Sequence, residues 1–244
     1  MKAKLDKILD NHTTHWQWYK GFFNITVLRY LVTWFAIVPI ILKLVENADP
    51  SLKVKDIVEI QIVNNTSLPF SLQILWISSL LFVIALFLYH IFCPGFIKTY
   101  SSYADYLKHH HSPRWIIWEA HKVVDDKNEM DKLFERLNEK GYVSMHQNEI
   151  IKSEVKIENA QTVIYFNHNG QNYKMGLPIV ENGNEAKDKT AIAEREIFWE
   201  VFGRFSSSKK YIRLAILILL IISGLLFSWT LIEHIWTGFK YIIQ

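Results

Sequence analysis

The sequence is poor in the residue types that mark several protein classes. It holds one cysteine in 244 residues, which excludes an internal disulfide framework and a cysteine-based zinc site. Its formal net charge is only +3, so no broad basic surface indicates a nucleic-acid partner. It has no Gly-rich phosphate loop, no His-Glu-x-x-His and no Gly-x-Ser-x-Gly. We therefore assign no catalytic residue, no metal ligand and no cofactor from sequence.

Apolar residues are abundant instead. Half of the chain is hydrophobic, 14% is aromatic and the mean hydropathy is +0.07. A soluble domain of this size normally has a negative mean hydropathy, because its surface must be wetted. Charged residues still make up 21% of the chain, so apolar and charged residues must be segregated. This pattern excludes a disordered or fibrous protein.

Three segments are long and apolar enough to cross a bilayer, which takes about 20 residues. They are residues 22–45, 72–93 and 210–233, and no carboxylate lies in the apolar core of any of them. The first contains Arg29, whose long side chain can reach the headgroups from near the helix end. Pro39 predicts a kink late in the same helix.

The distribution of lysine and arginine predicts the orientation. Lysines are frequent in residues 1–21, whereas residues 46–71 carry two lysines and four acids. Basic residues also flank the segment between the second and third spans. We expect a cytosolic N-terminal segment (1–21), an extracytoplasmic loop (46–71), a cytosolic domain (94–209) and an extracytoplasmic tail (234–244). The expected location is the bacterial inner (plasma) membrane, as a multi-pass protein.

The interior segment changes its hydrophobic period along its length. Ser112-Pro113 predicts one helix start, and a second helix follows Asp126 and stops at Gly141. Alternation at Val155 and Ile157 and the turn Asn169-Gly170 then predict two or three antiparallel strands. A polar loop (181–190) precedes a last helix (191–205). The predicted fold is three transmembrane helices with a small cytosolic α+β domain inserted between helices 2 and 3.

The last helix carries an apolar stripe with helical spacing. We expect the stripe to be buried in the domain, with Phe205 reaching partly into the headgroup layer and residues 206–208 forming the joint to the third span. Its members are Ile197, Phe198, Val201, Phe202 and Phe205.

Two groups of residues are candidate interaction sites. A basic cluster is expected to contact anionic lipid headgroups or, alternatively, a phosphorylated ligand; it comprises Arg204, Lys209, Lys210 and Arg213. Gly224 and Ser228 form a small-xxx-small pair that favours close helix packing. The run His109–His111 is interpreted as a polar loop, because consecutive side chains point in different directions.

These features favour a non-enzymatic integral membrane protein that tethers a sensing or partner-binding domain. It would be a membrane effector or sensor component, for example in bacterial defence. Its expected partners are the lipid bilayer, a protein at the cytosolic domain and further copies of itself. Two alternatives remain open: a membrane-anchored enzyme acting on lipid or nucleotide, and a subunit of an oligomeric channel.

Overall fold

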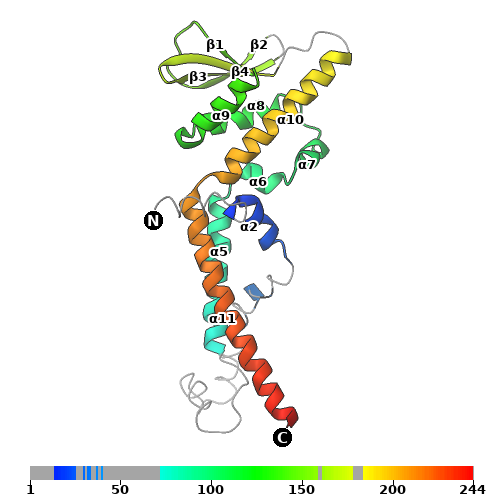
Figure 1. The fold of residues 1–244 in the computed structure, drawn as a ribbon, viewed down its shortest axis with the longest axis vertical. Coiled ribbons are helices and arrows are strands. Elements are labelled where there is room, and N and C mark those ends of the chain that lie inside the picture. Colours follow the sequence, from blue (N-terminus) through cyan, green and yellow to red (C-terminus); the bar gives the residue numbers. More distant parts are fainter. Residues whose placement is uncertain are drawn as a thin grey trace. The chain divides into compact units, whose positions relative to one another are not determined.

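The computed structural model describes residues 14–25, 30, 32–33, 37, 40, 72–158, 161–177 and 184–243. These residues form helices and one small antiparallel sheet (Figure 1). The helices are α2 (Trp16–Phe23), α5 (Leu72–Phe92), α6 (Gly95–Thr99), α7 (Tyr103–Lys108), α8 (Trp115–Val124), α9 (Lys127–Glu139), α10 (Asn184–Ser207) and α11 (Lys210–Ile243). The strands are β1 (Val143–Met145), β2 (Glu154–Glu158), β3 (Gln161–His168) and β4 (Gln171–Gly176).

The chain divides into two compact units. The membrane-helix unit consists of Met1–Thr14, Trp18–Cys93 and Lys209–Gln244, and the α+β unit consists of His15–Gln17 and Pro94–Ser208. In the described part of the chain, two helices are long and apolar enough to cross a membrane: Gln73–Phe92 within α5 and Lys210–Lys240 within α11. They coincide with the second and third predicted spans and weakly indicate a membrane protein. Most of the first predicted span (22–45) lies outside the described residues.

Helices α5 and α11 lie side by side in the membrane-helix unit (Figure 1). Buried positions recur at intervals of three and four residues on α5, and of three, four and seven residues on α11, as in coiled-coil-like packing. They include Leu75, Ser78, Phe82, Ala85 and Tyr89 on α5, and Arg213, Ile216, Leu220, Ser223 and Thr230 on α11.

A reciprocal pair of hydrogen bonds fixes the register of these two helices. The Ser78 hydroxyl donates to the Ser223 carbonyl, and the Ser223 hydroxyl donates to the Ser78 carbonyl, each at 2.9 Å. Small hydroxyl side chains allow this close approach while satisfying their own polar atoms inside an apolar pair. In the sequence, neither Ser78 nor Ser223 differs from the other hydroxyl residues of these apolar segments.

The sheet of the α+β unit has the strand order β1-β4-β3-β2, with every pair antiparallel. The predicted hairpin is confirmed, because His168 pairs with Gln171 around Asn169 and Gly170. Both turn residues have positive φ, 50° and 79°, as a two-residue hairpin requires. Strand β1 extends the sheet beyond the predicted strands; it is only three residues long, too short to show a period.

Helices α8 and α9 cover one face of the sheet (Figure 1). Ile164, Phe166 and Met175 point to this inner face and are buried. The stripe prediction for α10 is confirmed as well, since Ile197, Phe198 and Val201 are fully buried and Phe202 is 4% exposed. Phe205 is half-buried and its ring lies 5.4 Å from that of Phe96 in α6.

One boundary prediction is wrong. The predicted loop 181–190 is helical from Asn184, so α10 begins seven residues before the predicted start at Ala191. The segment Asn-Glu-Ala-Lys-Asp-Lys-Thr is rich in polar residues, and polarity alone does not separate a polar stretch of helix from a loop. Similarly, α11 continues to Ile243, past the predicted end of the span at residue 233.

Candidate functional site

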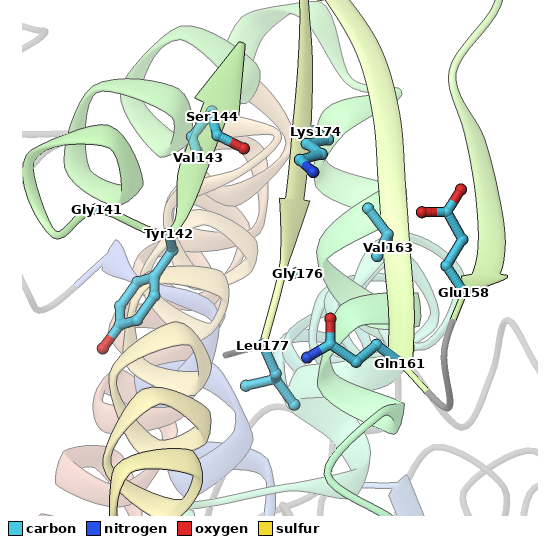
Figure 2. A pocket seen from close by; sticks show the side chains of 10 residues that line it. All are labelled: Gly141, Tyr142, Val143, Ser144, Glu158, Gln161, Val163, Lys174, Gly176 and Leu177. Carbon is cyan, nitrogen blue, oxygen red and sulfur yellow. The ribbon is translucent and has the colours of Figure 1, made fainter. Parts of the chain in front are cut away.

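A pocket of about 340 Å³ lies on the outer face of the sheet, opposite the face that α8 and α9 cover (Figure 2). It is formed where β1 and β3 begin and β2 and β4 end. Its lining residues are Gly141, Tyr142, Val143, Ser144, Glu158, Gln161, Val163, Lys174, Gly176 and Leu177.

The pocket exists because the centre of this face lacks a side chain. Gly176 pairs with Val163 in the β3–β4 ladder, and a Cβ at Gly176 would lie 3.2 Å from the Thr162 carbonyl oxygen and 3.3 Å from the Val163 Cγ2. Such contacts are tight, so the ladder is closely fitted at this point. The larger side chains of the neighbouring rows form the walls around the glycine (Figure 2).

The polar groups of the pocket differ in whether they have hydrogen-bond or ion-pair partners. The exposed ammonium of Lys174 forms no hydrogen bond or ion pair in the described structure. The Nε2 of half-buried Gln161 is shielded from solvent and has no hydrogen-bond partner there. Glu158, in contrast, accepts a hydrogen bond from Tyr165. Burial, with the nearby Glu158, raises the pKa of Tyr165 to about 12, so this tyrosine remains a neutral donor.

One wall of the pocket is connected to α10. The Tyr142 hydroxyl donates to the Glu196 carboxylate at 2.9 Å, and Lys140 lies 3.1 Å from the Glu200 carboxylate. Burial, followed by the contact with Glu196, raises the pKa of Tyr142 to about 12. The β1 end of the pocket is therefore held to α10 by a hydrogen bond and an ion pair.

A second polar cluster lies between α7 and α10. The Tyr106 hydroxyl donates to the Glu194 carboxylate at 3.1 Å, and both side chains are buried. Burial raises the pKa of Glu194, and the hydrogen bond from Tyr106 partly opposes that shift. We interpret this buried pair as part of the core.

The histidine run packs as aromatic side chains. The rings of His109 and His111 stack at 5.5 Å, and His111 stacks on Trp115 at 5.0 Å. The His111 Nε2 lies 2.8 Å from the Tyr100 hydroxyl. Within the described ranges, no group of three histidine, cysteine or acidic residues is arranged to hold a metal ion.

The predicted basic cluster is divided between the two units. Arg204 belongs to the α+β unit, where its charge acts on Glu129. In the membrane-helix unit, the Lys209 ammonium donates to the Phe92 carbonyl at 3.1 Å, and the Lys210 ammonium lies over the Tyr211 ring. Arg213 is only 1% exposed and donates to the Thr14 carbonyl at 2.6 Å. Lipid contact stays a prediction, and the buried Arg213 side chain has a protein partner instead.

Gly224 and Ser228 are both exposed on α11, next to the face that contacts α5. The small residue that packs against α5 is Ser223. Packing of Gly224 and Ser228 against another helix stays a prediction.

Sequence reasoning missed the pocket and its polar groups. Gln161, Lys174 and Gly176 lie on two different strands and acquire meaning only through the register of the ladder. One available signal was the Gly-Tyr-Val sequence after α9, where a helix stop leads into a strand. Comparison with known proteins adds no assignment: no family model, no curated protein and no solved structure matches the chain.

Proposed function

We propose that this chain is a three-span membrane protein that tethers a sensing or partner-binding α+β domain to the cytosolic face. Its N-terminus is cytosolic and its C-terminus extracytoplasmic, as the lysine and arginine distribution favours. It acts as a sensor or effector component and not as an enzyme.

The observation that carries this proposal is the link between the pocket and α10. Tyr142 and Lys140, at the pocket's β1 end, hold Glu196 and Glu200 on α10. Only Ser208 and Lys209 separate the end of α10 from α11, which is apolar enough to span a membrane. A molecule that displaces the pocket wall therefore acts on a helix whose chain leads directly into a membrane helix.

Membrane topology is tested with single cysteines in a Cys93→Ser background. We place one at the exposed Lys152 of the domain and one at Ile243, which is 73% exposed near the C-terminus. In intact cells, a membrane-impermeant maleimide should label position 243 and not position 152. Labelling of position 152 before permeabilisation would contradict the topology, and release of the protein by alkaline extraction would contradict membrane insertion.

Sensing is tested by a distance between α5 and α11. Ile84 and Ile218 are 40% and 48% exposed, so spin labels at these positions should leave the helix contact intact. A panel of metabolites is first screened for compounds that raise the Tm of the full chain in nanodiscs. Each such compound should change the label distance in the wild type and not in the variant that combines Tyr142→Phe with Lys140→Gln. Stabilisation without any change in distance argues against sensing.

A further inference from the structure

The pocket has two chemically different ends. Lys174 pairs with Tyr165 and with Ser144, so Lys174 and Ser144 share one row of the outer face. Gln161 and Glu158 pair with each other in another row, four residues before Tyr165 at the start of β3. Four residues of a strand correspond to roughly 13 Å. The Gly176–Val163 row lies between the two and forms the floor (Figure 2).

The Lys174 end suits an anion. It presents an ammonium that is not engaged by any described carboxylate, together with the Ser144 hydroxyl on the adjacent strand. The Glu158 carboxylate extends back along β2 toward the level of Lys174 (Figure 2), where it accepts a hydrogen bond from Tyr165, the residue that pairs with Lys174. An anionic group beside Lys174 and Ser144 gains a charge-assisted hydrogen bond from the ammonium.

The Gln161 end suits a hydroxyl group. Gln161 offers an Nε2 donor that lacks a hydrogen-bond partner. A hydroxyl group can accept a hydrogen bond from this amide. A purely apolar group would leave the shielded Gln161 amide unsatisfied.

We infer that this pocket binds a small hydroxylated anion, a polyol phosphate or a hydroxy acid, with its anionic group at Lys174 and a hydroxyl group at Gln161. The volume of about 340 Å³ accommodates roughly ten water-sized groups, which matches a molecule of that size. The inference rests on the proposed sensing function and names the chemical class that is sensed.

The test is isothermal titration of the full chain in detergent at constant ionic strength. Glycerol 3-phosphate combines both features, whereas inorganic phosphate and glycerol each have one. Glycerol 3-phosphate should bind saturably and more tightly than either. Lys174→Gln should weaken binding about tenfold, the loss expected for one charge-assisted hydrogen bond, and Lys174→Arg should largely restore it. Gln161→Met, which keeps the side-chain length, should weaken binding and reduce the preference over inorganic phosphate.

Lys152→Gln is the matched control. Lys152 is an exposed lysine of the same unit outside the pocket, so its removal changes the net charge equally and should leave affinity unchanged. The inference is overturned if glycerol 3-phosphate shows no saturable binding, if glycerol binds equally well, or if Lys174→Gln and Lys152→Gln behave alike. Because Lys174 is exposed, its substitution should leave the Tm unchanged.

Phosphoglycerol headgroups of lipids carry the same chemistry as a free polyol phosphate. Titration in phosphatidylglycerol and phosphatidylcholine nanodiscs distinguishes the two sources. If the lipid headgroup is the ligand, phosphatidylglycerol should compete with glycerol 3-phosphate in a way that requires Lys174, and phosphatidylcholine should not. If a free compound is the ligand, glycerol 3-phosphate should bind equally well in both kinds of nanodisc. The label distance between Ile84 and Ile218 separates the two proposals. Binding without a distance change refutes sensing only, and absence of binding refutes the pocket assignment only.

Discussion

Phe198 is the residue whose truncation tests the core of the α+β unit most directly. Its side chain is fully buried, and its ring lies 5.2 Å from Tyr106, 5.4 Å from Phe96 and 5.6 Å from Phe202. These rings come from α6, α7 and α10, so the residue joins three helices. Phe198→Ala removes the buried ring and leaves a cavity that surrounding aromatic rings fill poorly.

The expected cost is about 3–5 kcal/mol, the range measured for buried phenylalanine truncations. A domain of this size loses about 4 °C in Tm per kcal/mol, so the Tm of the unit should fall by about 12–20 °C. The measurement is thermal unfolding of the detergent-solubilised full chain, with circular dichroism as the signal that monitors unfolding of the domain.

Ile192→Ala is the control on the same helix. Ile192 is 50% exposed, and a truncation at such a site typically changes stability by less than about 1 kcal/mol. If Phe198→Ala melts within a few degrees of Ile192→Ala, α10 does not supply the core and the packing argument fails.

Three further outcomes are expected. Glu194→Gln should raise the Tm at neutral pH. Burial raises the pKa of Glu194 in the folded state, so the contribution of this group to stability is greatest below its unfolded pKa of about 4.3 and is lost as pH rises through the folded pKa. Parallel Tm–pH curves for variant and wild type would contradict this. Ser78→Ala and Ser223→Ala should each cost about 0.6 kcal/mol in detergent unfolding. The double variant should cost less than the sum of the two, because the two hydroxyl oxygens also lie 3.4 Å apart within one hydrogen-bond network; strictly additive costs would contradict this. Tyr142→Phe should lower the free energy of unfolding by about 1.5 kcal/mol in chemical denaturation, because it removes a hydrogen bond to a charged acceptor. Adding Glu196→Gln to Tyr142→Phe should restore less than half of that loss.

Local patterns in the sequence predicted the elements that depend on local physics. Asn169-Gly170 specifies a hairpin because both positions take positive φ readily, and the register followed from the turn. The stripe from Ile197 to Phe202 indicated burial because one face of a helix must be covered. In both cases a few neighbouring residues contain the whole signal.

Features that depend on distant partners were not predictable. Arg213 lies among basic residues beside an apolar segment, which favours headgroup contact, yet it is buried and bonded to Thr14. Nothing near Arg213 in sequence identifies a partner 199 positions away. The pocket likewise depends on the alignment of Lys174, Gly176 and Gln161 by the β3–β4 register. That register brings together residues that are unremarkable in the linear sequence.

Lys209 combines a local backbone conformation with a side-chain contact to a residue that is distant in the sequence. It lies between α10 and α11 with φ of 52°, a left-handed conformation that costs a non-glycine residue about 1–2 kcal/mol. Glycine would remove this strain but would also remove the ammonium that donates to the Phe92 carbonyl at the C-terminus of α5. A cation at a helix C-terminus is stabilised by the helix dipole and by the unpaired carbonyls there. The side-chain contact thus offsets the backbone strain, and lysine at this joint fixes the start of α11 against the end of α5.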